Sequence, residues 1–116
     1  MNDNLDRFVP LSPAALHILL SLLGEERHGY AIMQEIAEQT NGLYKLGPGT
    51  LYDNIHRLMK EGLVEETENT GSGAESRRRY YRLTRRGRHV VESEIARLEK
   101  AIRNAKLRLA CERNAG

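Results

Sequence analysis

Apolar side chains recur at intervals of three and four residues in two stretches near the start of the chain. The first stretch follows Ser12 and Pro13, which suit the cap and the first position of a helix, and it ends at Gly24, a typical stop residue. The second stretch, HGYAIMQEIAEQT, begins at His28, which can cap a helix, and breaks at Gly42. The spacing predicts two short amphipathic helices whose apolar faces contribute to one core.

A third helix is predicted within GPGTLYDNIHRLMKEGLVEE, residues 47–66. Gly47 and Pro48 suit its first positions, and Gly62 can adopt the left-handed conformation that ends it. Its predicted buried stripe is Leu51, Ile55, Leu58 and Met59. Its expected exposed side consists of Gly49, Thr50, Tyr52, Asp53, Asn54, His56, Arg57 and Lys60. This side carries groups that reach phosphates and base edges, where a plain solvated helix would carry mainly Glu and Lys.

Two segments after this helix, LVEETEN and RRRYYRLT, have the composition of strands, and TGSGAES between them has that of a turn. They predict a β-hairpin in which Tyr80 and Tyr81 point to opposite faces. Thr84 can cap a final helix from about residue 86 toward residue 113. Its heptad seam comprises Val91, Ile95, Leu98, Ile102, Ala105 and Leu109. Such a seam predicts pairing with a second helix, since a helix about 37 Å long outreaches so small a core.

Three helices with a tight turn between the second and third, followed by a hairpin, make a winged helix-turn-helix. We therefore expect a mainly α protein with a small β-hairpin and a long C-terminal dimerisation helix. The expected divisions are a flexible segment at 1–10, the winged helix-turn-helix domain at 11–84 and the dimerisation helix at 85–116. A length of 116 residues leaves room for one domain with an appended helix and excludes a large enzyme cleft.

The composition excludes several other classes of protein. No stretch approaches the roughly 18 to 20 apolar residues needed to cross a membrane, and the polar N-terminus is unlike a signal peptide. We therefore expect a cytoplasmic protein that makes no contact with a membrane. Cys111 is the single cysteine, and His17, His28, His56 and His89 are scattered. They give no disulfide framework, no metal-ligand spacing and no nucleophile pair, so we expect neither a metal nor a cofactor.

The charge is divided unevenly along the chain. Residues 1–76 carry 5 Lys or Arg against 12 Asp or Glu, and residues 77–116 carry 13 against 4, so the two parts have formal charges of -7 and +9. Such asymmetry suggests a polyanionic partner for the basic part, although the two parts can also pair with each other in the fold.

Three blocks of the chain resemble the signature segments of the PadR family of bacterial transcriptional regulators. They are HGYAI (28–32), GPGTLYDNIHRLMKEGLV (47–64) and RRRYYRLTRRGR (77–88). The resemblance extends from about Leu11 to the C-terminal helix, and PGTLY followed in order by RLMKEGL and YYRLT is specific. With one helix after the wing, the chain looks like the compact subfamily with a single C-terminal helix. The resemblance implies a homodimer built through that helix, with a double-stranded DNA operator as partner.

The chain departs from the family pattern at several positions. Gly47 stands where many members carry Ser, which removes a capping hydroxyl from the third helix. Asp53 stands where members often carry Pro or another small residue. An acidic group there can accept from cytosine N4 or repel a phosphate, so the base contacts need not match those of relatives. Some relatives stack flat aromatic drugs on a Trp at the dimer interface, and this chain has no Trp, so the sequence does not support an effector site of that kind. Whether another small-molecule effector exists is unknown.

The candidate DNA contacts come from the third helix and the hairpin. An α-helix fits the major groove, where the expected readers of base edges are Tyr52, Asn54, His56 and Arg57, with Asn54 suited to adenine. The other candidates on or just before this helix are Lys45, Gly49, Thr50 and Lys60, of which Lys45, Thr50 and Lys60 suit phosphates. The wing contributes Arg77, Arg78 and Arg79, which would lie along the backbone or in the minor groove.

These observations favour a dimeric, sequence-specific DNA-binding repressor that acts on an inverted-repeat operator. The alternative is a winged-helix module that binds another protein through the same seam and face. The basic cluster of the wing and of Arg85, Arg86 and Arg88 favours DNA, because protein binding does not require it. Arg57 can instead pair with Glu61 one helical turn away. Paired carboxylates, a phosphate loop and a catalytic triad do not cluster, so we do not expect an enzyme.

Overall fold

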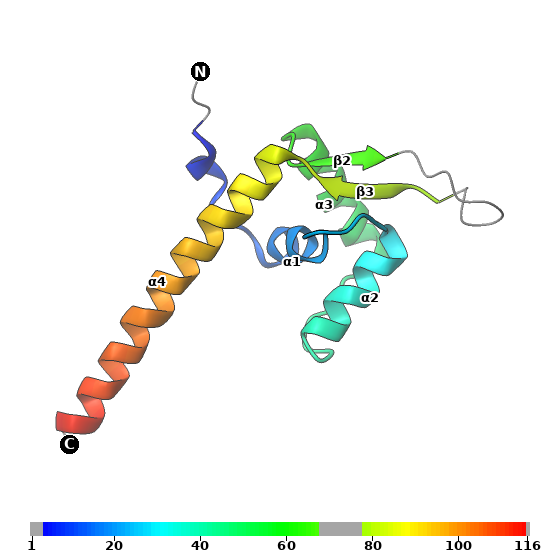
Figure 1. The fold of residues 1–116 in the computed structure, drawn as a ribbon. Coiled ribbons are helices and arrows are strands. Elements are labelled where there is room, and N and C mark those ends of the chain that lie inside the picture. The colour runs from blue at the N-terminus through cyan, green and yellow to red at the C-terminus, as the bar shows by residue number, and fades with distance from the viewer. Residues whose placement is uncertain (1–3, 68–77, 116) are drawn as a thin grey trace.

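The computed structural model describes residues 4–67 and 78–115, and these residues form a helical domain with a small sheet and a long terminal helix (Figure 1). In chain order the elements are η1 (Leu5–Phe8), α1 (Pro13–Ser21), β1 (Arg27–His28), α2 (Gly29–Gln39), α3 (Pro48–Lys60), β2 (Val64–Thr67), β3 (Tyr80–Leu83) and α4 (Arg85–Ala115). The predicted fold class, a winged helix-turn-helix with a long C-terminal helix, is confirmed.

The helices begin where the predicted caps place them. The Ser12 hydroxyl accepts a hydrogen bond from the backbone N–H of Ala15 at 3.2 Å, and Nδ1 of His28 accepts one from that of Ala31 at 3.1 Å. Gly47 precedes α3 without a side-chain cap, as its missing side chain dictates. Gly62 follows α3 with φ at +77°, a left-handed conformation that glycine adopts without steric cost.

The core lies where α1, α2 and α3 meet the sheet and the first turns of α4. Its fully buried side chains come from all of these elements and include Ile18, Leu19, Ile32, Ile36, Leu51, Ile55, Leu63, Val64, Val90 and Val91. The predicted stripe of α3 is confirmed for Leu51, Ile55 and Leu58, while Met59 is half-buried at its edge. Packing of these aliphatic side chains therefore sets the orientation of α3 and the face that it exposes.

The sheet has one strand more than the predicted hairpin. β2 and β3 pair antiparallel as expected, with Glu66 opposite Tyr81, and β1 pairs with the other edge of β3, with Arg27 opposite Tyr81. Tyr81 is buried and Tyr80 is half-buried, so the two rings point to opposite faces as predicted. A strand of two residues leaves no alternation to detect in the sequence. The predicted hairpin tip, TGSGAES, lies outside the described residues.

The start of α4 is tied closely to the end of α3. The Thr84 hydroxyl accepts from the backbone N–H of Gly87 at 3.0 Å and donates to the carbonyl of Gly62 at 2.6 Å. A Cβ at Gly87 would lie 2.1 Å from the carbonyl oxygen of Leu63, so only glycine lets the two backbones approach this closely. This junction fixes where the long helix leaves the domain.

α4 extends from the domain as an arm (Figure 1), and residues 101–114 of this arm are all exposed. The seam prediction is wrong for Val91, which is 1 % exposed because it packs into the domain's own core beside Val90. The remaining seam side chains are accessible to varying degrees, with Leu98 half-buried and Ile95, Ile102, Ala105 and Leu109 exposed. None of the described helices is both long and apolar enough to cross a membrane.

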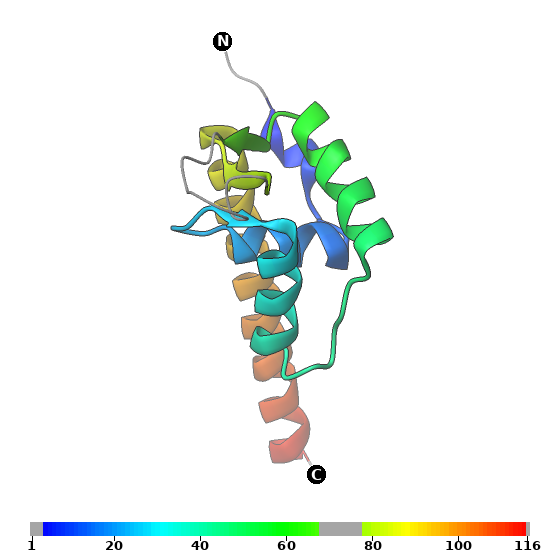
Figure 2. The same ribbon diagram turned by 90° about the vertical axis from the view of Figure 1, so that its right-hand side faces the viewer.

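The N-terminal segment is more ordered than expected. Residues 4–10, assigned by sequence to a flexible segment, include the short helix η1, whose Leu5 and Phe8 pack on the core. The backbone N–H of Leu11 then donates to the buried carboxylate of Glu94 on α4 at 2.8 Å. On its other side the segment lies against α3, with a cavity of about 200 Å³ between them. Figure 2 shows this arrangement, with α3 beside the N-terminal residues and α4 behind.

Candidate nucleic-acid interface

The exposed face of α3 carries most of the side chains predicted there. Gly49, Thr50, Asp53, His56, Arg57 and Lys60 are exposed, and Tyr52 is 37 % exposed. Lys45, in the loop before α3, is also exposed. We call the set Gly49, Thr50, Tyr52, His56, Arg57 and Lys60 the recognition face. Its hydrogen-bond donors and acceptors project from a helix whose opposite side is anchored in the core.

Asn54 is not part of this face, so the expectation that it is exposed is wrong. It is 9 % exposed, and its Nδ2 donates to the carbonyl of Thr50 at 2.8 Å. The side chain lines the cavity against the N-terminal segment, together with Phe8 and Leu11. Asn54 follows Leu51 by three residues, which puts it at the edge of the buried stripe, and the N-terminal segment covers that edge. A base contact from Asn54 would require its side chain to leave this position.

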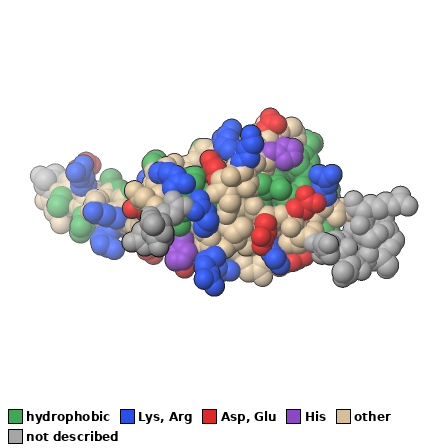
Figure 3. Space-filling model, turned by 90° about the horizontal axis from the view of Figure 1, so that it is seen from above, with side chains coloured by type: hydrophobic (Ala, Val, Ile, Leu, Met, Phe, Trp, Pro, Cys, Tyr) green, Lys and Arg blue, Asp and Glu red, His purple; other side chains and the backbone are tan. Residues whose placement is uncertain are grey.

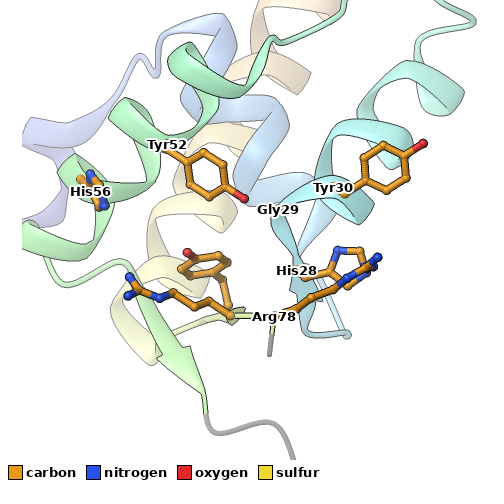
Figure 4. Close-up of a pocket in the computed structure, with 8 residues that line it drawn as sticks. His28, Gly29, Tyr30, Tyr52, His56 and Arg78 are labelled. Atoms are coloured by element: carbon orange, nitrogen blue, oxygen red, sulfur yellow. The ribbon is translucent and has the colours of Figure 1, made fainter. Parts of the chain in front are cut away.

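Tyr52 lies across the start of α2, above Gly29 (Figure 4). A Cβ at Gly29 would lie 2.1 Å from the Tyr52 hydroxyl oxygen, so the ring can occupy this place only because residue 29 has no side chain. Gly29 therefore lets a side chain of α3 approach the backbone of α2 closely. The contact joins α2 to the exposed side of α3.

A cavity of about 500 Å³ opens beside this contact, between α2, α3 and β3. We call it the donor pocket, because its lining is rich in hydrogen-bond donors: His28, Gly29, Tyr30, Tyr52, His56, Arg78, Arg79 and Tyr81. In Figure 4 the side chains of Tyr52 and His56 come from α3, and His28 and Arg78 approach one another from the opposite side. The pocket thus joins the recognition face to the base of the wing.

The wing arginines differ in their partners. Nη1 of Arg78 lies 2.8 Å from Nε2 of His28, whereas Nε of Arg79 lies 3.9 Å from a carboxylate oxygen of Glu66 on β2. Burial raises the pKa of the Tyr81 phenol behind them, with further increases from Tyr52 and Glu66 that Arg79 opposes. Tyr81 therefore stays neutral at ordinary pH. The third predicted wing arginine, Arg77, lies outside the described residues.

The acidic and basic parts of the chain meet across the sheet. Besides the pair of Arg79 and Glu66, Nε of Arg82 donates to Glu65 at 2.7 Å. Seen from above, Lys and Arg side chains lie over the domain and along the arm of α4, with Asp and Glu among them (Figure 3). Part of the charge asymmetry is therefore neutralised by pairing in the fold, which was one of the two interpretations of the sequence.

Two further predictions about basic residues have clear outcomes. In the described part of the chain, Arg57 makes no ion pair with Glu61, so that alternative role is not observed. Arg86 has a structural role, because its Nη2 donates to the carbonyl of Glu61 at the end of α3 at 3.1 Å. Arg85 and Arg88 are exposed. The crowding of arginines at the start of α4 thus combines one capping residue with two accessible cations.

Sequence reasoning missed the contribution of α2 to this site. His28 was interpreted only as a helix cap, and Tyr30, which is 57 % exposed, was not singled out. The available signal was that the segment HGY starts a helix, a place where exposed polar groups often meet phosphates. In the described residues, no group of three or more His, Cys, Asp or Glu could hold a metal ion.

Comparison with known proteins identifies a family and several sequence relatives. Residues 18–93 match the family described as transcriptional regulator PadR-like. A transcriptional regulator of Mycobacterium tuberculosis is 35% identical over 88 residues, which are 76% of this chain and 78% of that protein. An uncharacterised protein of Lysinibacillus sphaericus is 37% identical over 78 residues, 67% of this chain and 71% of that protein.

Solved structures share the fold. A transcriptional regulator from Clostridium thermocellum has a TM-score of 0.68 and 26% identity, covering 91% of this chain and 95% of its own. PadR of Bacillus subtilis, crystallised in complex with operator DNA, has a TM-score of 0.64 and covers 74% of this chain and 48% of its own; its identity of 22% shows the fold alone. Because the family match spans well over half of the sequence, the protein belongs to the PadR-like family, whose members are transcriptional regulators and not enzymes.

Proposed function

We propose that the protein is a sequence-specific DNA-binding regulator that acts as a homodimer, and as a repressor, on an inverted-repeat operator. The observation that carries this proposal is the continuity of the recognition face of α3 with the donor pocket. A helix about 10–12 Å across fits the major groove, so donors along α3 and donors beside it would meet base edges and backbone together. A DNA partner also places the protein in the cytoplasm.

The contacts divide into two kinds by position. Tyr52, His56 and Arg57 project from the middle of the recognition face and are the candidates for reading base edges. Lys45, Thr50 and Lys60 lie at or beyond its ends, where the phosphates of a bound duplex would pass, and Arg78 and Arg79 extend this set to the wing. The burial of Asn54 removes it from the candidate readers and gives it a structural role in α3.

The homodimer in this proposal forms through the arm of α4. Ile95, Ile102 and Leu109 are 40, 53 and 55 % exposed on one side of that helix. Full burial of an exposed side chain of this kind contributes roughly 1.5 to 3 kcal/mol, and covering the exposed part of these three contributes a corresponding share, which supports pairing with a second copy. A two-fold dimer presents two copies of α3, so its operator should contain half-sites about 10 bp apart or a multiple of that.

The direct test is selection of bound fragments from random duplex DNA, followed by titration of the selected duplex. We expect an inverted repeat whose affinity falls sharply when five base pairs are inserted between its half-sites. If Lys45, Lys60, Arg78 and Arg79 each meet a phosphate in both protomers, about eight phosphates are neutralised, and log K should fall with log salt at a slope of about -7. Transcription in vitro from a promoter that overlaps the operator should decrease as protein is added.

The matched control is Lys106→Ala, which removes an exposed cation of α4 far from the recognition face. It should leave the affinity for the operator unchanged, whereas Lys60→Ala should weaken binding to all duplexes and make the salt slope shallower. A flat salt dependence, or equal affinity for the out-of-phase duplex, would contradict the proposal. Those results would favour a winged-helix module that binds another protein. Higher transcription on addition of the protein would contradict the repressor role alone.

A further inference from the structure

The hydrogen bond that caps α2 determines the tautomer of His28. Nδ1 of His28 accepts from the backbone N–H of Ala31 at 3.1 Å, so this nitrogen carries no proton. A neutral imidazole has one protonated nitrogen, and the proton must then be on Nε2. Asn, Asp or Ser would cap the helix at least as well, so capping alone does not account for an imidazole at this position.

Nε2 of His28 and Nη1 of Arg78 are 2.8 Å apart, and both are donors. Arginine has no acceptor, so the contact brings two N–H groups to the same place instead of forming an ordinary hydrogen bond. An oxygen atom with a negative charge beside them could accept from both groups at once. Charge-assisted bonds of this kind are about twice as strong as neutral ones.

The surroundings of this contact favour an anion. The described residues that line the donor pocket include two arginines and two histidines and no carboxylate. Glu66 is not one of the lining residues, and its carboxylate is 3.9 Å from Nε of Arg79, its ion-pair partner. Tyr52 and His56 add donors from α3, and the pocket is open to solvent beside the recognition face (Figure 4).

From this geometry we propose that the donor pocket binds one phosphate of the DNA backbone, with a phosphate oxygen held between Nε2–H of His28 and the guanidinium of Arg78. The inference rests on the proposed function, since it names which part of the duplex meets this part of the protein. His28 thereby serves both α2 and the DNA: Nδ1 caps the helix, and Nε2 contacts the phosphate. The contact fixes how far α3 enters the major groove without reading sequence.

The test uses two variants that keep the fold. His28→Asn retains a side-chain acceptor for the cap and removes the Nε2 donor, and Arg78→Gln removes the charge at similar length. Each should weaken binding to the selected operator about tenfold, which corresponds to about 1.4 kcal/mol. Arg82→Gln is the control, because Arg82 lies on the same strand and pairs with Glu65 away from the pocket. Thermal unfolding of all three variants checks that the fold is kept.

Operators with a single neutral methylphosphonate locate the phosphate. At one position in each half-site, the methylphosphonate should reduce the affinity of wild-type protein by about the same factor as each substitution does on the unmodified operator. The same methylphosphonate should not reduce the affinity of the two variants any further. The inference would be overturned if the variants bind the unmodified operator as tightly as wild type does. It would also be overturned if every methylphosphonate reduces the affinity of the variants further. Either result would leave the proposed function intact. Wild-type protein that prefers no duplex would overturn both.

The alternative ligand with the same chemistry is a free phosphate ion. This alternative is tested by adding inorganic phosphate without DNA and following the imidazole NMR signals of His28. We expect at most weak binding that the operator displaces. If inorganic phosphate binds at His28 while His28→Asn leaves operator affinity unchanged, the pocket serves a free anion and the assignment to DNA is overturned.

Discussion

Glu94 is a buried carboxylate at the point where the N-terminal segment meets α4. Its oxygens accept from Nε of Arg97 at 2.6 Å and from the backbone N–H of Leu11 at 2.8 Å. The Arg97 hydrogen bond lowers the pKa of Glu94 below its ordinary value; burial opposes this shift, and the Leu11 hydrogen bond adds to it. A carboxylate whose folded-state pKa is lowered stabilises the protein above the pKa of the unfolded chain, about 4.3, and loses that contribution as the pH falls through the folded-state value.

Replacing Glu94 with Gln should therefore change both stability and its pH dependence. At pH 7 the variant should be less stable by about 1 to 3 kcal/mol, the usual range for losing hydrogen bonds to a charged group inside a protein. The difference from wild type should begin to shrink as the pH falls below about 4.3, because the carboxyl of the unfolded chain then binds a proton before the folded protein does. Urea unfolding between pH 3 and pH 7, at one protein concentration, measures both effects.

Glu99→Gln provides the control, since Glu99 is exposed on the same helix. It should leave stability and its pH dependence nearly unchanged. A difference between Glu94→Gln and wild type that stays constant across this pH range would show that the charge of Glu94 does not contribute to stability.

At the scale of elements, the relation of α2 to α3 depends on one contact. The ring of Tyr52 on α3 lies over Gly29, the first residue of α2, where a Cβ would be 2.1 Å from its hydroxyl oxygen and 2.7 Å from Cζ. Both distances are too short for real atoms, so any side chain at residue 29 must move the ring. The same ring lines the donor pocket, so the helix packing and the shape of the site are linked.

Gly29→Ala should therefore displace Tyr52 and destabilise the protein by about 1 to 3 kcal/mol, the usual cost of overpacking. Gly49→Ala is the matched control, because a Cβ there meets nothing within 4 Å. Alanine within α3 should stabilise the protein by up to about 1 kcal/mol. Thermal unfolding measures stability, and the NMR signals of the Tyr52 ring report its position.

A second substitution tests whether the Tyr52 ring causes the instability of Gly29→Ala. Tyr52→Leu in the Gly29→Ala background should recover part of the lost stability, since a smaller side chain leaves room for the new methyl group. If Gly29→Ala alone is as stable as wild type with an unshifted Tyr52 ring, the contact does not limit the approach of α2 and α3.

At the scale of the whole molecule, α4 makes the protein elongated. Its dimensions are 63 × 41 × 23 Å and its radius of gyration is 17.1 Å, against about 13 Å expected for a compact chain of this length. Most of the arm touches nothing else in the described chain, and its apolar side chains remain accessible. Helices that extend in this way are usually stabilised by a partner, which underlies the proposed homodimer.

The double variant Ile95→Asp and Ile102→Asp should be monomeric, because each Asp would bring a charge into the apolar seam. Sedimentation measures the mass of the assembly. The affinity for the operator should also fall, since each monomer would then bind a single half-site. The control is Lys100→Asp with Asn104→Asp, which adds acidic groups to the other side of α4 and should leave the assembly unchanged. A folded Ile95→Asp and Ile102→Asp variant that sediments as an unchanged dimer would contradict the seam as the interface.

Local features of the sequence were sufficient to predict where most elements begin and end. Ser12 and His28 cap helices through their own side chains, and Gly62 ends α3 in a left-handed conformation. The stripe of Leu51, Ile55 and Leu58 is buried as its spacing predicts. These outcomes depend on interactions between residues a few positions apart, so the local amino-acid sequence is sufficient to predict them.

Tertiary structure decided which faces are covered and which residues meet. Asn54 is buried because the N-terminal segment lies on its side of α3, and Val91 is buried because the first turns of α4 complete the domain core. Tyr52 meets Gly29 across 23 positions of sequence, and His28 meets Arg78 across 50. Spacing along one helix cannot reveal such contacts, because they depend on the relative placement of separate elements. The physical reason is that burial is a property of a residue's neighbours in space, and those neighbours are set only when the core has packed.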